Sequence, residues 1–313
     1  MSAAYGEQVT TRSNAITIIG AGVAGAACAN VLRDAGLAFR VLDRGRAVGG
    51  RMASPLLHDR RVDIGAGYFT VRDPEFEAVV QRWEAAGIAR PWTDTFGVLT
   101  PDTAPATSTG PMRWATPNGL RSLVQNLLSE IDTETVNVDH LPDGDVVLAM
   151  PDPQAARLSA VADPVEYQPV VTVVCGFDSL ELPFRHAAFV NDHPVLEFVA
   201  DDGARRGDGA PVLVVHTTAE MAKDHLDEPN RAVAPVVTAV HALVGSTEPV
   251  WSYAHRWTFA KPSSVHAASY HLTESSGRRI GFAGDQWCPS GAPRIESAWR
   301  SGTDLGRALV ASR

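Results

Sequence analysis

The chain has 313 residues, 45% of them hydrophobic and 20% charged, which suits a globular protein with one large or two moderate domains. Its formal net charge is −9, and its arginines are scattered rather than clustered. These features exclude a basic nucleic-acid-binding face and a polybasic membrane-binding segment, so we expect neither nucleic acid nor membrane as a partner.

Residues 1–14 are expected to form a disordered tail. The apolar stretch that follows, from Ala15 to Leu32, is interrupted by glycines and lacks a basic flank, so it is not typical of a signal peptide. No window approaches the roughly 20 continuous apolar residues of a membrane span. We therefore expect a cytoplasmic protein.

The first predicted strand, Ile16–Ile19, is short and β-branched, and the glycine pattern GxGxxG follows it at Gly20, Gly22 and Gly25. The first glycine permits a tight turn, the second lets the backbone approach a pyrophosphate, and the third allows close packing of helix on strand. The alanine-rich stretch after them predicts a helix that ends near Gly36. The unpaired N–H groups at its N-terminus favour a phosphate.

A second strand is predicted at Phe39–Leu42 and ends at Asp43, whose carboxylate can accept hydrogen bonds from an adenosine ribose. Strand, glycines, helix, strand and acid in this order indicate a dinucleotide site. A glycine pair and an arginine follow at Gly49, Gly50 and Arg51. A nicotinamide dehydrogenase does not need them, whereas an extended FAD can use the open backbone and the guanidinium fork for its phosphates.

The central region predicts a second sheet. The stretch 97–117 is rich in proline and threonine and is interpreted as a loop over a cleft or a mobile connector. Strands are predicted at 170–174, 196–200, 211–216 and near 251–259, and helices at 219–226 and 229–243. The stretch 205–207, Arg-Arg-Gly with acids on both sides, is interpreted as a solvated hairpin turn. These elements predict an antiparallel sheet with helices on one side.

The C-terminal region predicts a strand at Ile280–Ala283, a sharp turn at Gly284-Asp285 and a helix at Arg294–Val310. The cysteines, Cys28, Cys175 and Cys288, include no CxxC pair, and the ten histidines show no metal-ligand spacing. The sequence therefore predicts reduced thiols and no metal site.

Six stretches spread over nearly the whole chain resemble the flavin amine oxidase superfamily and, more closely, its renalase-like branch of FAD-dependent oxidoreductases. They are DRGRAVGGRM (43–52), DIGAGYFTVRDPEF (63–76), PNGLRSLVQNL (117–127), DVVLAMPDPQA (145–155), HRWTFAKP (255–262) and GFAGDQWCPSGAPRIESAWRSG (281–302). The chain departs from many relatives between residues 133 and 145, where they carry additional strands, so we expect a trimmed cofactor domain.

The resemblance implies an α/β fold with a discontinuous Rossmann-like FAD-binding domain and a smaller antiparallel-sheet substrate domain with helices. The FAD-binding domain is expected to comprise residues 15–75, 115–163 and 266–313, and the substrate domain residues 76–114 and 164–265. The FAD is expected to be non-covalent, because covalent relatives place their cysteine well before the C-terminal strand and Cys288 follows it. The residues expected at the cofactor are Gly20, Gly22, Ala24, Gly25, Asp43, Arg44, Gly50, Arg51, Met52, Gly67, Tyr68, Gly284, Asp285 and Glu296.

The catalytic candidates are Trp257, then Tyr68, then His255. Aromatic walls can hold a planar substrate near the flavin and keep the site dry. His255 and Arg256 can bind an anionic or carboxamide group, and Trp114 is expected at the entrance. A purely structural role in the core competes with each of these assignments.

The resemblance implies oxidation of aberrant dihydro-NAD(P) isomers by hydride transfer to the flavin, with dioxygen reduced to hydrogen peroxide. Two alternatives remain open. One is another amine oxidase-type enzyme acting on a small amine or C–H donor, and the other is a flavin-binding module without turnover. A reductase with its own NADPH site is disfavoured, because no second GxGxxG follows a predicted strand.

Overall fold

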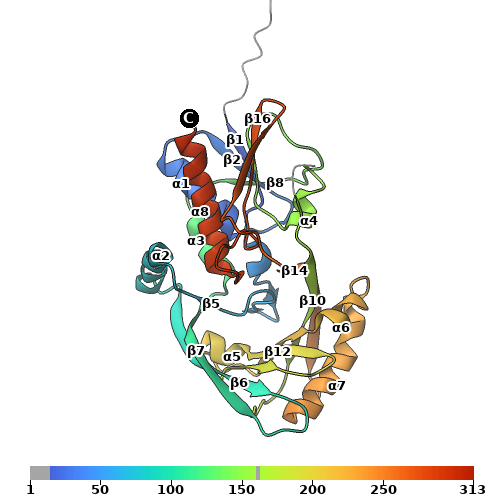
Figure 1. Cartoon of the computed structure of the whole chain (residues 1–313). Helices are drawn as coiled ribbons and strands as arrows, with labels where there is room; N and C mark the ends of the chain where they lie inside the picture. The colour runs from blue at the N-terminus through green and yellow to red at the C-terminus, as the bar shows by residue number, and fades with distance from the viewer. Residues whose placement is uncertain (1–14, 160–162) are drawn as a thin grey trace, which may run out of the picture.

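The computed structural model describes residues 15–159 and 163–313. The expected tail at residues 1–14 lies outside these ranges. Figure 1 shows two sheets, one flanked by the helices α1 and α8 and the other a curved sheet that carries α6 and α7. Their strands and helices alternate along the chain as in a mixed α/β protein, so the predicted fold class is confirmed.

The first sheet has six strands in the order β15-β16-β9-β1-β2-β8, and its pairs are parallel apart from the β15–β16 hairpin. Its buried β-branched strands form the predicted Rossmann-like core. The strands are β1 (Ile16–Ile19), β2 (Phe39–Asp43), β8 (Thr133–Thr135), β9 (Val146–Leu148), β15 (His271–Ser275) and β16 (Arg278–Phe282).

Helices α1 (Val23–Asp34) and α8 (Ile295–Ala311) pack closely because α8 presents glycines to α1. A Cβ at Gly302 would overlap the carbonyl of Ala24, and one at Gly306 would crowd Val31. Thus the C-terminal helix is held beside the first helix of the chain. The other elements outside the second sheet and its helices are the 3-10 turn η1 (Gly50–Met52), β3 (Leu56–Leu57), β4 (Arg60–Arg61), α2 (Pro74–Ala85), α3 (Arg121–Leu127) and α4 (Asp152–Ala155).

The second sheet has eight strands in the order β14-β10-β13-β12-β11-β6-β7-β5. The β6–β11 pair is parallel and the other pairs are antiparallel. The strands are β5 (Phe69–Thr70), β6 (Arg90–Leu99), β7 (Ala106–Ala115), β10 (Tyr167–Gly176), β11 (Ala187–Val190), β12 (Leu196–Asp201), β13 (Val212–Thr217) and β14 (Trp251–Pro262).

The two faces of this sheet have different partners. The outer face carries alternate apolar residues such as Val173 and Val215, which pack against α6 (Ala219–Lys223) and α7 (Val233–Val244). On the inner face, Val174 and Val214 pack against Val62 and Ile64. The inner face therefore meets the segment that enters β5.

Three details differ from the sequence-based predictions. The stretch 97–117 is not a loop, because β6 and β7 form a long hairpin there. Arg205 and Arg206 do not form a solvated turn: they are 0% and 9% exposed and end the short helix α5 (Asp202–Arg206). The helix predicted from Pro229 begins as a 3-10 turn, η2 (Pro229–Ala232), before α7. The division into domains at the stated boundaries stays a prediction.

Within the described ranges, no helix combines the length and apolar character needed to cross a bilayer.

Candidate cofactor and substrate site

The glycines of the first motif have different surroundings. A Cβ at Gly20 would overlap the carbonyl of Ala149, and one at Gly25 would overlap the carbonyl of Gly20. Gly20 also has a φ of +113°, which favours glycine. At Gly22, the N-terminal cap of α1, a Cβ would meet no atom within 4 Å. Of these three glycines, only Gly22 therefore borders space that protein atoms do not fill.

Asp43 links the two glycine motifs. Its carboxylate accepts the backbone N–H of Ala21 and that of Gly45, each at 2.6 Å. In addition, the N–H of Gly49 donates to the carbonyl of Ala21 at 2.9 Å. Arg44, the residue after Asp43, is exposed. Asp43 thus fixes the turn after β1 and the chain after β2 in one arrangement.

The second glycine pair lies against the first motif. Gly49 and Gly50 have positive φ angles of +116° and +51°, and a Cβ at Gly50 would lie 3.7 Å from the Cα of Gly22. Among the residues that the structure describes, no side chain caps the N-terminus of α1. Bare backbone, open space and a helix N-terminus therefore coincide, and these features fit the pyrophosphate of a dinucleotide.

Arg51 joins this region to the C-terminal turn. Its guanidinium donates to both carboxylate oxygens of Asp285, at 2.6 and 2.9 Å, and to the carbonyl of Ala260 at 3.1 Å. Burial alone would lower the pKa of Arg51, but the Asp285 carboxylate and Tyr167 outweigh burial and raise that pKa. The predicted contact between Arg51 and a phosphate stays a prediction, because the guanidinium fork here binds a carboxylate.

The other predicted cofactor residues near the C-terminus have protein partners. The N–H of Gly284 donates to Ser301 Oγ at 3.0 Å. The Glu296 carboxylate accepts the backbone N–H groups of Arg72 and Asp73, at 2.5 and 3.0 Å, and so ties the start of α8 to the start of α2. A cofactor contact of Glu296 therefore stays a prediction.

Two further predicted residues, Ala24 and Met52, are 5% and 3% exposed and belong to the core beneath α1. Their side chains pack against protein. The structure thus places these two beside the glycine motifs without testing their contact with a cofactor.

A row of side chains crosses the inner face of the second sheet. His255 on β14 is opposite Thr172 on β10, which is opposite His216 on β13, which in turn is opposite Phe198 on β12. Directly opposed residues of paired strands project from the same face. Trp257, two residues after His255, shares that face. Sequence analysis did not predict Thr172 or His216 as site residues.

This inner face is hydrogen-bonded to the segment before β5. The carbonyl of Ile64 accepts Thr172 Oγ1 at 2.7 Å and Trp257 Nε1 at 2.9 Å, and the carbonyl of Gly67 accepts Arg205 Nη1 at 3.1 Å. On its other side, the N–H of Ala66 donates to the carbonyl of Arg51 at 3.0 Å. The segment 64–68 is therefore fixed between the inner face and the cofactor region.

The two histidines of the row are held neutral. Burial, and after it the charge of Arg256, lowers the pKa of His255. Burial, and after it the charges of Lys261 and Arg205, lowers the pKa of His216 to about 3. His216 Nε2 is enclosed without a hydrogen-bond partner. At neutral pH both imidazoles can therefore accept or donate a hydrogen bond without carrying charge.

Tyr68 belongs to an aromatic cluster at the other end of the inner face. Its ring meets that of Phe96 edge-on at 5.2 Å between centroids and that of Phe198 at 6.3 Å. Trp114 stacks on Phe69, with 6.1 Å between centroids, and its expected place at the entrance stays a prediction. Tyr68 thus lies on the inner face, whereas Trp114 packs with the core of the first sheet.

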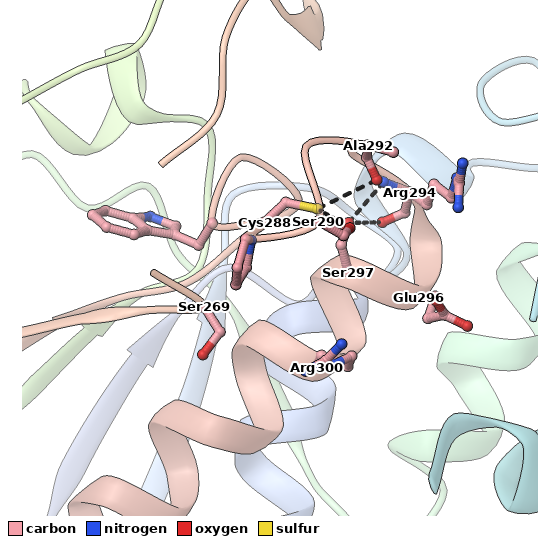
Figure 2. A pocket seen from close by; sticks show the side chains of 10 residues that line it. Ser269, Cys288, Ser290, Ala292, Arg294, Glu296, Ser297 and Arg300 are labelled. Carbon is pink, nitrogen blue, oxygen red and sulfur yellow. Dashed lines mark hydrogen bonds between the residues drawn. The ribbon is translucent and has the colours of Figure 1, made fainter. Parts of the chain in front are cut away.

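A small pocket lies beside the start of α8, and Figure 2 shows Cys288 and Glu296 among its lining residues. The thiol of Cys288 is buried and contacts Ser290 Oγ at 3.1 Å and the carbonyl of Ala292 at 3.3 Å. Through these contacts the Cys288 thiol stabilises the turn before α8. The expectation of non-covalent FAD is not tested by them.

Comparisons with known proteins agree with this architecture. Residues 18–83 match the family described as NAD(P)-binding Rossmann-like domain. A renalase of Mus musculus is 24% identical over 303 residues, which cover 80% of this chain and 85% of that protein.

Solved structures of low sequence identity share the fold. A putative protoporphyrinogen oxidase from Exiguobacterium has a TM-score of 0.74 at 14% identity, covering 96% of this chain and 99% of its own. A cyclohexylamine oxidase from Brevibacterium oxydans has a TM-score of 0.71 at 13% identity, covering 95% and 98%. The predicted resemblance to renalase-like FAD-dependent oxidoreductases, and with it the oxidoreductase class and the FAD cofactor, is confirmed.

Proposed function

We propose that this chain oxidises a dihydronicotinamide isomer of NAD(P) to the ordinary oxidised dinucleotide and reduces dioxygen to hydrogen peroxide. The observation that carries the proposal is the inner face of the second sheet. There, neutral His255 and the ring of Trp257 share one face of the sheet, and Trp257 donates to the segment 64–68. This segment includes Tyr68 and is bonded to Arg51 of the cofactor region. Similarity to a renalase supports the same reaction class.

FAD would be held by the open backbone at Gly22 and Gly50, with Asp43 orienting both turns. Bound FAD would supply the hydride acceptor and the route for two electrons to dioxygen. In the net reaction, the dihydro isomer, one dioxygen and one proton give NAD(P)⁺ and one hydrogen peroxide. The C–H bond of the donor ring is the bond that breaks.

The protein residues would position the donor and exclude water. The rings of Trp257 and Tyr68 offer flat apolar surfaces for a nicotinamide ring. The neutral imidazole of His255 can hydrogen-bond the carboxamide without placing a cation beside a centre that loses hydride. Positioning of this kind, rather than proton transfer, is the main demand of a hydride donor with a weak C–H bond.

Anaerobic stopped-flow mixing of the flavin-loaded protein with the 2- and 6-dihydro isomers of NAD(P) tests the proposal. We expect the flavin absorption to bleach within seconds, and one hydrogen peroxide per donor after dioxygen is admitted. Trp257→Phe should slow bleaching by roughly tenfold through looser positioning, whereas Trp251→Phe, at the far end of β14, is the matched control. An unchanged flavin spectrum with both isomers would exclude this function.

The amine oxidase-type alternative has support only at the level of fold, through neighbours such as the cyclohexylamine oxidase. A panel of primary amines distinguishes it: peroxide from an amine, with no response to dihydronicotinamides, would favour that reading. Tight flavin binding without reduction by any donor would instead favour a flavin-binding module.

A further inference from the structure

Arg113 on β7 is a buried cation without a carboxylate partner. Its exposed fraction is 6%, and among the described residues no carboxylate oxygen lies within 4.0 Å of its guanidinium. Arg205 and Arg206, which are buried to a similar degree, both pair with Asp202. Because a buried charge is costly unless it is paired, Arg113 requires a separate explanation.

The surroundings of Arg113 satisfy only part of its guanidinium. Nη1 donates to the carbonyl of Asp94 at 2.5 Å. The guanidinium carbon lies 3.9 Å from the centroid of the Phe96 ring and 5.6 Å from that of Tyr68. These ring faces attract a cation but do not accept its Nε and Nη2 hydrogens as a carboxylate would. The Nε and Nη2 atoms are not among the enclosed atoms without partners, so solvent or a ligand can reach them.

The position of Arg113 connects it to the candidate substrate site. Phe96 is in the same aromatic cluster as Phe198, which neighbours His216 in the cross-strand row. Tyr68, the last residue of the segment 64–68, contacts Phe96 and Phe198 with its ring. Arg113 therefore stands at the Tyr68 end of the inner face, and no carboxylate of the described residues pairs with its remaining donors.

We propose that Arg113 and Tyr68 form an anion subsite that binds the acidic group of a substrate whose planar part lies along the inner face. A guanidinium binds carboxylates and phosphates through parallel N–H donors, and the neighbouring ring supports a planar group. The subsite deepens the proposed function on which it rests, because a dinucleotide carries phosphates. The same cation would repel the ammonium group of a free amine.

The test uses benzoate, benzamide and benzylamine, which share a ring and carry an anionic, a neutral and a cationic group. Their binding to the flavin-loaded protein is followed by perturbation of the flavin spectrum and, independently, by isothermal titration calorimetry. Wild-type protein should bind benzoate at least tenfold more tightly than benzylamine. Arg113→Met should weaken benzoate binding by roughly 10- to 100-fold and leave benzamide binding within about threefold.

Two variants complete the design. Arg82→Met removes an exposed positive charge on α2 and should leave the three affinities unchanged, which controls for net charge. Arg113→Lys keeps the positive charge but loses the two parallel N–H donors of the guanidinium. The affinity for benzoate should therefore fall, while benzoate still binds more tightly than benzamide, and benzamide more tightly than benzylamine. If Arg113→Met does not fold, the preference of the wild type for benzoate over benzylamine and the benzoate affinity of Arg113→Lys test the subsite.

Equal binding of benzoate and benzylamine by the wild type, or an unchanged benzoate preference in folded Arg113→Met, would overturn the subsite. These measurements do not require turnover. Arg113-dependent anion binding without flavin reduction by any dihydronicotinamide would leave the subsite standing and remove the proposed substrate. Flavin reduction with no role for Arg113 would remove the subsite alone.

Discussion

The glycines of the first motif have two different roles, one in packing of the protein and one at the expected cofactor site, although they belong to one sequence pattern. Gly20 and Gly25 are required by the protein itself, because any Cβ there overlaps a backbone carbonyl. Gly22 faces open space, and its φ of −80° is accessible to other residues. Nothing in the folded chain therefore requires glycine at position 22, and the requirement is assigned to the cofactor.

This distinction predicts that Gly22→Val loses flavin without losing the fold. The valine side chain would occupy the expected phosphate path, so the purified protein should carry less than about a tenth of the wild-type flavin, in line with the loss of several phosphate hydrogen bonds. The melting temperature of the apoprotein should stay within a few degrees of wild type. Flavin released by heating and a thermal melt of apoprotein measure the two quantities.

Gly25→Ala provides the contrast, because its Cβ would press on the carbonyl of Gly20 and destabilise the protein whether or not flavin is present. Full flavin occupancy in Gly22→Val would contradict the placement of the phosphates.

Sequence analysis predicted the positions of the GxGxxG turn and of Asp43, which depend on local pattern. It did not predict that the Asp43 carboxylate binds the backbone N–H groups of Ala21 and Gly45, and the ribose contact of Asp43 stays a prediction. The roles of His216 and Arg113 depend on strands that are adjacent only in the folded sheet. The only sequence feature that could have indicated His216 was a single histidine inside the apolar strand β13. The face of the sheet on which this histidine lies could not be predicted without the strand register.

At the scale of elements, two of the three mispredicted regions were wrong for a similar reason: each resembles a turn or loop in sequence. In the β6–β7 hairpin, Pro101 and Pro105 lie in the connection, and Thr107 and Thr109 lie in exposed strand positions. Turn residues and polar strand residues together therefore resemble a loop in sequence. Arg205 and Arg206 follow acids in sequence, which imitates a solvated turn. Their partner Asp63 is more than 140 residues away, and only the fold brings it into contact.

Helix α5 is held by an ion-pair cluster whose pH dependence follows from Asp202. Burial alone would raise the pKa of Asp202, but Arg205 and Arg206, with a hydrogen bond from Arg60, outweigh burial and hold that pKa below its usual range. Because the folded pKa is depressed, this carboxylate stabilises the protein above about pH 4, its unfolded value. That stabilisation is lost as the pH falls through the folded pKa.

Asp202→Asn should therefore lower the free energy of unfolding by about 3–5 kcal/mol at pH 7, because it removes the buried carboxylate that hydrogen-bonds both Arg205 and Arg206 and leaves them only the more distant Asp63. The difference from wild type should shrink as the pH falls below about 4. Urea unfolding at several pH values measures it. Asp208→Asn, which removes a half-exposed partner of Arg60, should cost less than about 1 kcal/mol. A difference that is independent of pH would refute this assignment.

At the scale of the whole molecule, the segment 64–68 connects the two sheets. One side of it receives side-chain donors from β10, β14 and α5, and the other donates to the carbonyl of Arg51. Arg51 in turn binds Asp285 after β16. Segments far apart in the sequence thus meet in one hydrogen-bonded chain that runs from the cofactor region to the inner face. A change at the inner face should therefore affect the cofactor region.

The carbonyl of Ile64 makes this connection measurable, because it accepts from both Thr172 and Trp257. Thr172→Val or Trp257→Phe alone leaves one donor, so each should lower the free energy of unfolding by roughly 1 kcal/mol beyond its packing change. The double variant leaves the buried carbonyl without a partner. Its loss should exceed the sum of the two single losses by about 1–2 kcal/mol.

A double-mutant cycle by urea unfolding measures that coupling, and Tyr253→Phe combined with Thr172→Val is the control, because Tyr253 bonds His255 rather than Ile64. Since the same segment is bonded to Arg51, the double variant should also shift the flavin spectrum of the loaded protein, whereas the control pair should not. Additive losses together with an unshifted spectrum would contradict this coupling. In that case the hydrogen bonds at Ile64 would not couple the inner face to the cofactor region.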